Sequence, residues 1–233
     1  MENKISILST RPVNEQQVHE AASRNIVVDS ISFIETEPIE NVEVQQEIES
    51  ALLRPAVVVF TSMNAVDAVS QYITDEKPSW TIYCIGNTTK KLAIQYFGDE
   101  AIAGCASDAA NLAELIIADG ENDSVTFFCG DQRRDELPSL LADNNIEVDE
   151  IVVYETVLVP HKIKKKYHGI LFFSPSAVES FFSVNKIAVE VTIFAIGKTT
   201  AQAITKHCAN KIIVSEDSSK YGLVEKMMEY FSG

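Results

Sequence analysis

Three short blocks of the sequence recur at a nearly constant distance along the chain. They pair residues 62–66 ("SMNAV") with 174–178 ("SPSAV"), residues 85–89 ("IGNTT") with 196–200 ("IGKTT"), and Ser107 and Leu112 with Ser218 and Leu223. The offset is 112 residues for the first block and 111 for the other two. An offset that holds to within one residue over three blocks indicates two copies of one supersecondary unit.

The second copy reaches Gly233 without the last part of the first copy, which continues to about residue 154. The N-terminus resembles that missing part. The two matches are "ILSTRP" (7–12) with "FFCGDQ" (127–132) and "FIET" (33–36) with "VYET" (153–156), both at an offset of 120. We therefore predict a discontinuous first domain of residues 1–34 and 160–233, a second domain of residues 37–151, and a two-stranded β linker at residues 35–36 and 152–159. Two connections restrain a hinge but still allow two domains to open and close.

Short apolar runs alternate with helical patterns along the whole chain. The run at residues 56–60 ("AVVVF") precedes an amphipathic stretch at 64–73, and the run at 191–197 ("VTIFAIG") precedes another at 198–208. Such alternation is typical of α/β domains with mostly parallel sheets. Several runs are apolar on both faces, as a sheet between two helix layers requires. We expect two similar α/β domains, each with a parallel sheet flanked by helices.

The chain is strongly acidic, with 34 Asp and Glu residues against 19 Lys and Arg and a net charge of −15. Nucleic acids and anionic membranes are therefore disfavoured as partners, because both require a basic face. The one basic run, residues 162–168 ("KIKKKYH"), is typical of a solvated linker. No apolar run approaches the ~18 residues of a membrane helix, and residues 1–12 lack the layout of a signal peptide. We expect a cytoplasmic protein.

Neither the cysteines nor the histidines form a pattern typical of a metal site. The four cysteines contain no CxxC pair, and the four histidines are scattered. The chain also lacks the GxGxxG motif of dinucleotide-binding folds, and "IGKTT" shares only the GKT letters of the Walker motif. We expect reduced thiols and no metal site, and we regard ATP and NAD as poor ligands.

Each repeated Ser/Thr turn lies where a predicted strand ends and a predicted helix begins. A hydroxyl there can cap the helix by accepting a hydrogen bond from a free N–H, and capping alone explains any single turn. In an open parallel sheet, however, this edge also binds ligands, and helix N-termini attract carboxylates and phosphates. We therefore expect the two domains to face each other across a cleft that holds one large anion.

Five basic residues at predicted strand-to-helix edges supply positive charge for such an anion: Arg11, Arg133, Arg134, Lys198 and Lys220. Because the chain as a whole repels anions, binding has to come from local backbone donors and a few such side chains. The alternative for each of them is an ordinary solvated charge. Arg133 and Arg134 also fit an exposed first helical turn.

Six motifs together resemble those of the uroporphyrinogen-III synthase family in order and spacing. They are "VVVFTSMNAV" (57–66), "YCIGNTT" (83–89), "FFCGDQRRDELPSLL" (127–141), "VVYETV" (152–157), "LFFSPSAV" (171–178) and "FAIGKTTA" (194–201). The resemblance covers essentially the whole chain. It implies two α/β domains joined by two β-strands, the first domain built from both chain ends, and no metal or organic cofactor.

The resemblance also implies a cyclising lyase of tetrapyrrole (heme) biosynthesis. Members of the family close the linear hydroxymethylbilane to uroporphyrinogen III, with loss of water and inversion of the terminal pyrrole ring. The eight carboxylates of that substrate suit two edges of helix N-termini. The uncatalysed product is the uninverted isomer, so such an enzyme mainly enforces geometry, and one positioned acid helps the hydroxyl to leave. The implied partners are this small molecule and, for a transient handover, the preceding enzyme of the pathway.

The family's motifs also imply roles for individual residues. Tyr154 is implied as the proton donor, since a phenol stays protonated at neutral pH; its alternative role is packing between domains. The residues expected to bind substrate are Arg11, Ser62, Asn64, Thr88, Thr89, Gly130, Arg133, Ser174, Ser176, Lys198, Thr199, Thr200 and Lys220. Met63 departs from the proline that many members carry, whereas Pro175 keeps it in the other copy.

A second class of function stays open on the sequence: a non-catalytic two-lobed protein that binds a tetrapyrrole or another small anion, or a regulatory sensor. A DNA-binding regulator would carry a helix-turn-helix segment or a basic face, and neither is visible. A phosphotransfer receiver would need a strand-end Asp in each unit. Asp131 is one such residue, but its counterpart in the repeat is Arg11.

Overall fold

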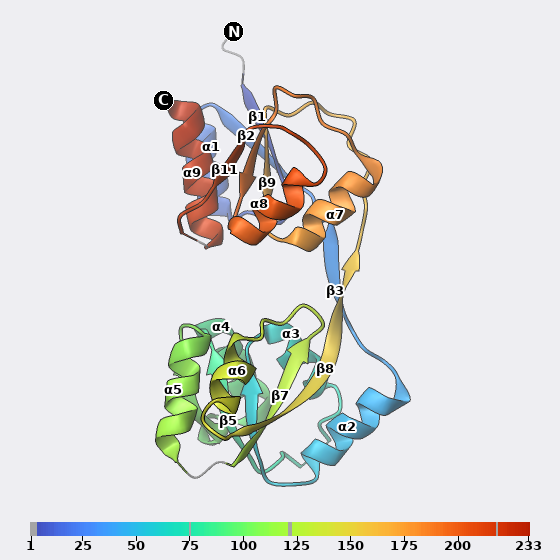
Figure 1. The fold of residues 1–233 in the computed structure, drawn as a ribbon, viewed down its shortest axis with the longest axis vertical. Helices are drawn as coiled ribbons and strands as arrows, with labels where there is room; N and C mark the ends of the chain where they lie inside the picture. Colours follow the sequence, from blue (N-terminus) through green and yellow to red (C-terminus); the bar gives the residue numbers. More distant parts are fainter. Residues whose placement is uncertain (1–3, 75, 121–122, 218) are drawn as a thin grey trace. The chain divides into compact units, whose positions relative to one another are not determined.

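The computed structural model describes residues 4–74, 76–120, 123–217 and 219–233; Ser218 of the third repeated block lies outside them. The chain divides into two compact units (Figure 1). Unit 1 combines Met1–Glu35 with Val157–Gly233, and unit 2 consists of Thr36–Thr156. Unit 1 is therefore discontinuous in sequence, and both ends of the chain belong to it.

Unit 2 contains a sheet with the described strand order β3-β8-β7-β4-β5-β6, in which the pairs from β8 to β6 are parallel. The strands are β3 (Ile34–Pro38), β4 (Ala56–Phe60), β5 (Trp80–Ile85), β6 (Ile102–Ala106), β7 (Ser124–Gly130) and β8 (Glu147–Leu158). The helices are α2 (Val42–Leu52), α3 (Met63–Ser70), α4 (Asn87–Phe97), the 3-10 turn η1 (Asp99–Ala101), α5 (Ala109–Asp119) and α6 (Glu136–Ala142).

Unit 1 contains a parallel sheet with the described order β11-β10-β9-β1-β2. The strands are β1 (Ile5–Ser9), β2 (Ile26–Ser30), β9 (Gly169–Phe172), β10 (Thr192–Ala195) and β11 (Ile212–Val214). The helices are α1 (Glu15–Ser23), α7 (Pro175–Val184), α8 (Lys198–Thr205) and α9 (Lys220–Ser232).

The two sheets have the same topology once the sequence repeat is applied. The offsets of the repeat pair β4, β5 and β6 with β9, β10 and β11, and the N-terminal match pairs β7 and β8 with β1 and β2. With these equivalences, the orders β6-β5-β4-β7-β8 and β11-β10-β9-β1-β2 are identical. The predicted fold class, two similar α/β domains with parallel sheets, is confirmed.

Both sheets are covered by helices on both faces. In β4, Val58 and Phe60 pack with the core under α2, α3 and α4, whereas Val59 packs under α5 and α6. In β1, Leu8 faces α7 and α8, and Ile7 faces α1 and α9. Successive side chains of a strand point to opposite faces, so two helix layers require a continuous apolar run. Within the described ranges, no helix has both the length and the apolarity to cross a membrane.

Two strands carry the chain between the units. β3 leaves unit 1 and β8 returns to it, and the two are neighbours in the sheet. The amide of Ile39 donates to the carbonyl of Val153, and the amide of Val159 donates to that of Phe33, both at 2.9 Å. As one partner's number rises, the other's falls by the same amount, so the strands run antiparallel.

Candidate functional site

The carboxyl ends of parallel strands lie along one edge of each sheet. We define the unit 2 edge as the carboxyl ends of β4 to β7, the helical turns that follow them, and the part of β8 around Tyr154 that lies beside the end of β7. We define the unit 1 edge in the same way from β1, β9, β10 and β11. All residues predicted to bind substrate lie on these two edges, and so does Tyr154. Parallel pairing alone therefore gathers residues that are more than 100 positions apart in the sequence.

The two repeated serines cap helices on the two edges. The Ser62 hydroxyl accepts from the amide of Asn64 at the start of α3, and the Ser174 hydroxyl accepts from the amide of Ala177 at the start of α7, both at 3.1 Å. The predicted capping role is confirmed for both. Capping uses one free amide of each first turn, and other amides there stay available to a ligand. Asn64 and Ser176 lie in these same turns and are half-buried.

The two glycine turns of the repeat differ in backbone conformation. Gly86, before α4, has φ +81°, a left-handed conformation that favours glycine, whereas Gly197, before α8, has an extended φ of −169°. The threonines that follow divide in the same way in both turns. Thr88 and Thr199 are exposed at the edge, whereas Thr89 (4% exposed) and Thr200 (1%) are buried beneath the first turn.

Three exposed cations lie on the unit 1 edge: Arg11, Lys198 and Lys220. In the part of the chain that the structure describes, none of the three forms an ion pair. Partial desolvation of the charged group lowers the pKa of Arg11, and partial desolvation followed by the nearby charge of Arg11 lowers the pKa of Lys220. Each charge is therefore less well solvated here than in water, and a bound carboxylate would stabilise it.

The turn that presents Arg11 is held from beneath by buried hydroxyls. Ser9 donates to the carbonyl oxygen of Arg11, and Thr10 donates to that of Leu171 in β9 at 2.8 Å. These contacts fix the chain after β1 against the neighbouring strand, so the position of Arg11 is set by the sheet.

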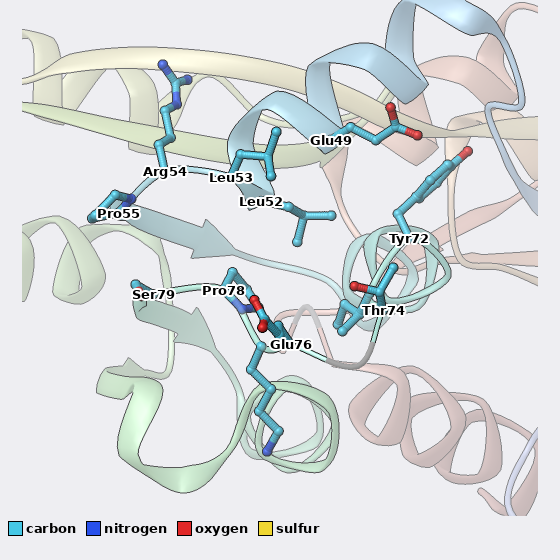
Figure 2. A pocket seen from close by; sticks show the side chains of 12 residues that line it. Glu49, Leu52, Leu53, Arg54, Pro55, Tyr72, Thr74, Glu76, Pro78 and Ser79 are labelled. Carbon is cyan, nitrogen blue, oxygen red and sulfur yellow. The ribbon is translucent and has the colours of Figure 1, made fainter.

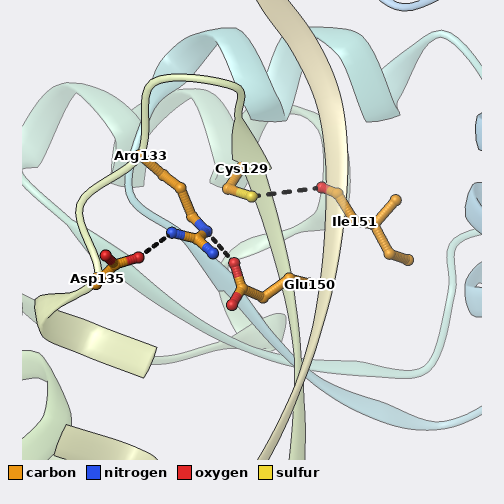
Figure 3. A network of polar contacts seen from close by, with 5 residues as sticks. All are labelled: Cys129, Arg133, Asp135, Glu150 and Ile151. Atoms are coloured by element: carbon orange, nitrogen blue, oxygen red, sulfur yellow. Dashed lines mark hydrogen bonds and ion pairs between the residues drawn. The ribbon is translucent and has the colours of Figure 1, made fainter. Parts of the chain in front are cut away.

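Arg133 on the unit 2 edge is neutralised within the protein. Its guanidinium contacts the carboxylates of Glu150 in β8 and of Asp135 just before α6 (Figure 3). Burial raises the pKa of the neighbouring Cys129 thiol to about 11, so this thiol is uncharged at neutral pH. The sequence pattern missed the pair with Glu150, because that residue reaches Arg133 only through the β7–β8 pairing.

Tyr154 lies over Gly130 at the end of β7, and the two residues are partners in the β7–β8 register. A methyl group on Gly130 would lie 2.3 Å from the tyrosine Cζ and 2.7 Å from its hydroxyl oxygen. The half-buried ring packs against the core on the face of α2, α3 and α4. The backbone amide of Asp131 donates to the carbonyl of Tyr154 at 3.1 Å.

A second concave region of unit 2, a cavity, lies away from these edges. A cavity of about 500 Å³ opens at the amino ends of β4 and β5, where Leu52, Leu53 and Tyr72 line it with Glu49 and Arg54 (Figure 2). It is at the opposite end of the strands from the unit 2 edge. The described ranges hold no group of three or more His, Cys, Asp or Glu residues that could bind a metal ion.

Comparison with known proteins finds a family and a curated relative that each match most of the chain. Residues 16–225 match the family model described as Uroporphyrinogen-III synthase HemD. The chain is also 26% identical over 250 aligned positions to the Porphyrin biosynthesis protein HemD of Ruminiclostridium josui. That alignment covers 97% of this chain and 49% of the relative, so the chain spans about half the length of this curated protein.

Two solved structures share the fold. Uroporphyrinogen-III synthetase from Helicobacter pylori aligns with a TM-score of 0.65 at 17% identity, covering 97% of this chain and 99% of that one. A mutant uroporphyrinogen III synthase from Thermus thermophilus aligns with a TM-score of 0.58 at 13% identity, covering 97% and 98%. At such identities the similarity shows the common architecture and no more.

Proposed function

Because this chain belongs to the uroporphyrinogen-III synthase family, we propose that it closes hydroxymethylbilane to uroporphyrinogen III, with loss of water and inversion of the terminal pyrrole ring. The observation that carries the proposal is the family match over residues 16–225, which includes the turns that start α3, α4, α7, α8 and α9 but not the turn of Arg11 after β1. The substrate is a small molecule with eight carboxylates, and we propose that the two edges bind these carboxylates.

The unit 1 edge supports this proposal through its unpaired charge. In the described part of the chain, Arg11, Lys198 and Lys220 have no acidic partner at all, although the protein as a whole is acidic. Lys198 and Lys220 are also the first residues of α8 and α9, where free backbone amides add to the positive potential. Charge and dipole thus favour the same class of ligand, a carboxylate.

The unit 2 edge supports the proposal through backbone donors. Arg133 there is already paired, whereas the neighbouring Arg134 is exposed and forms no ion pair within the described ranges. Carboxylates are therefore expected to bind the first turns of α3 and α4, with Asn64 and Thr88 beside them, and Arg134 adds one free cation to this edge. Thr89 and Thr200 are buried beneath these turns, so in this proposal they act on the ligand only indirectly. In this proposal Ser62, Ser174 and Ser176 position the amides of their turns.

In the proposed reaction, Tyr154 donates a proton to the hydroxyl that leaves the first ring as water. The pyrrole nitrogen supplies the electrons, which gives an azafulvene-type cation. The terminal ring attacks this cation through its substituted carbon to give a spiro intermediate. The bond that joined the terminal ring to the neighbouring pyrrole's methylene bridge then breaks, and that bridge bonds to the free carbon of the terminal ring, which inverts the ring. Loss of the proton on that carbon restores the pyrrole and reprotonates Tyr154. A protein that holds several carboxylates of the substrate at once restricts the chain of pyrroles to this geometry.

The test is the isomer composition of the product. Purified protein is incubated with freshly prepared hydroxymethylbilane, the product is oxidised, and the porphyrin isomers are separated by chromatography. We expect isomer III to replace the isomer I that forms without enzyme. Isomer I alone, together with measurable binding of the tetrapyrrole, would instead establish the non-catalytic binding protein.

A further inference from the structure

We infer that Gly130 and the β-bulge beside it position the phenol of Tyr154, which makes Gly130 a positioning residue for the reaction. The inference rests on the proposed function and deepens it, because it assigns a role in the reaction to a glycine, which has no side chain to contact the substrate. It is carried by the strand register, by the space over Gly130 and by the hydrogen bonds around both residues.

The β-bulge turns Tyr154 toward the face on which Gly130 lies. Cys129 pairs with Val152, but the next residue, Gly130, pairs with Tyr154, so β8 holds one additional residue at this point. As a result Val153 and Tyr154 both pack with the core under α2, α3 and α4, whereas Val152 packs under α5 and α6. Strict alternation along the strand would send the tyrosine to the opposite face.

Glycine at position 130 leaves the space that the phenol occupies. An added Cβ would lie 2.3 Å from the ring Cζ, far inside van der Waals contact. Among the described residues, the glycines with positive φ are Gly86, Gly98 and Gly120. Any residue could therefore adopt the backbone of Gly130, and the close approach of the ring is the reason for glycine here.

The backbone around the tyrosine is held more firmly than the ring. The amide of Asp131 donates to the carbonyl of Tyr154 at 3.1 Å, and the Asp131 carboxylate accepts from the amide of Thr156 at 2.9 Å. The ring itself is half-buried, and its phenol end is the part that meets Gly130. A methyl group at position 130 is therefore expected to displace the phenol and to leave the strand pairing intact.

The same sheet offers a matched control. A Cβ on Gly104 in β6 would lie 2.8 Å from the ring Cδ1 of Tyr83, so a glycine again lies under a tyrosine. Tyr83 is only 3% exposed, and its hydroxyl donates to Asp119. Gly104 belongs to neither edge turn, so Gly104→Ala tests the loss of stability from a crowded ring without moving Tyr154.

The experiment compares Gly130→Ala, Tyr154→Phe, the double variant and Gly104→Ala. Each is assayed with fresh hydroxymethylbilane for kcat, KM and isomer III fraction, and unfolded in urea. We expect Tyr154→Phe to lower kcat by about 100-fold, as for loss of a general acid. Gly130→Ala should lower kcat by roughly 10- to 100-fold with KM nearly unchanged, as for a misplaced group. The double variant should be no slower than Tyr154→Phe, and Gly104→Ala should retain kcat even where it is less stable.

Three results would overturn the inference. The first is an unchanged kcat in Gly130→Ala. The second is a further loss in the double variant beyond that of Tyr154→Phe, because Gly130 would then act independently of the phenol. The third is an active Tyr154→Phe beside an impaired Gly130→Ala. Failure of the proposed function itself is distinct from all three, since the unmodified protein would then give isomer I alone.

Discussion

At the scale of single residues, the two edges differ in how they carry charge. Arg11 and Lys220 on the unit 1 edge lie close enough for the charge of Arg11 to lower the pKa of Lys220, and neither has an ion-pair partner among the described residues. Arg133 on the unit 2 edge contacts two carboxylates. Affinity for a carboxylate should therefore depend mainly on cationic side chains on the unit 1 edge, and on backbone amides together with the exposed Arg134 on the unit 2 edge.

Replacement of Lys220 by glutamine should weaken substrate binding without weakening the fold. A charge-assisted hydrogen bond of ~1.5 kcal/mol corresponds to a rise in KM of about tenfold. The urea midpoint should stay the same or rise, because the variant removes a desolvated cation that lies near Arg11. Steady-state kinetics and urea unfolding measure the two effects. A KM equal to that of the unmodified protein would exclude Lys220 from the binding site.

The pH dependence of KM follows from the same residue. The pKa of Lys220 lies below its ordinary 10.5, so the free protein loses this charge earlier than an exposed lysine would as the pH rises. KM should therefore increase in the alkaline range, and Lys220→Gln should remove this increase. The free energy of unfolding should also rise with pH, although substrate binding weakens. Between the lowered pKa and 10.5 the unfolded chain binds more protons than the folded one, so stability rises with pH there. An identical alkaline profile in the variant would contradict the assignment.

Arg133 and Arg11 should respond differently to the same substitution. Arg133→Gln breaks contacts with Glu150 and Asp135, and it should cost up to about 1 kcal/mol of stability with a change in KM of less than about threefold. Arg11→Gln should raise KM by about tenfold, as estimated for Lys220. Kinetics and urea unfolding of the two variants decide the point. A larger KM for Arg133→Gln than for Arg11→Gln would show that Arg133, and not Arg11, is the more important arginine for substrate binding.

At the scale of the elements, the helix N-termini combine a structural and a binding role. Ser174 caps α7, and the Pro175 that follows it has no amide N–H, so fewer free donors remain there than in α3. Ser62 caps α3 in the corresponding position of unit 2. The repeated turn is thus one local structure that satisfies the backbone and presents the remaining amides at the sheet edge.

Two substitutions of Ser174 separate capping from binding. Ser174→Ala should lower stability by about 1 kcal/mol, whereas Ser174→Gly should cost only a few tenths, because glycine is tolerated at the N-cap. If the hydroxyl acts only by capping, KM should rise in Ser174→Ala, which loses stability, and should change little in Ser174→Gly, which largely keeps it. A similar rise of KM in both variants would show that the hydroxyl itself contacts the substrate. Urea unfolding and steady-state kinetics provide the two measurements.

At the scale of the whole molecule, the discontinuous unit 1 depends on both chain ends. β1 lies between β9 and β2 in the sheet, and Leu8 and Ile7 of β1 pack on opposite faces with helices from the C-terminal part. Phe33, also from the N-terminal part, is fully buried against α7 residues. The C-terminal segment alone therefore lacks two strands and part of both core layers.

A fragment of residues 36–156 should fold on its own, whereas a fragment of residues 157–233 should not. The first retains the parallel strands β4 to β7 and nearly all of β8, and the second exposes the edge of β9 where β1 belongs. Far-UV circular dichroism and urea titration should show a cooperative transition for the first fragment only. A cooperative transition in the second would mean that β9, β10 and β11 suffice for a stable sheet.

Much of the fold was predictable because its determinants are local and repeated. Alternating apolar runs predict strands between two helix layers, and a constant offset predicts two copies, as β4 and β9 confirm. The Ser62 and Ser174 caps were also visible, since a cap involves residues within three positions of each other. The pairing of Arg133 with Glu150 was not visible, because it depends on which strand lies beside β7.

By itself, the sequence determined the fold class, the repeat whose second copy is completed by the N-terminus, and the positions of the edge turns. Each of these depends on patterns within a few residues or on a comparison of the two copies. Only the tertiary structure decided which of the edge cations lack an acidic partner and how Tyr154 is aimed. Those features arise from side chains of different strands and from one additional residue in β8 at the bulge. A bulge reverses the alternation of side chains without leaving a mark in the periodicity, so the contact between Gly130 and Tyr154 follows only from the register of the folded sheet.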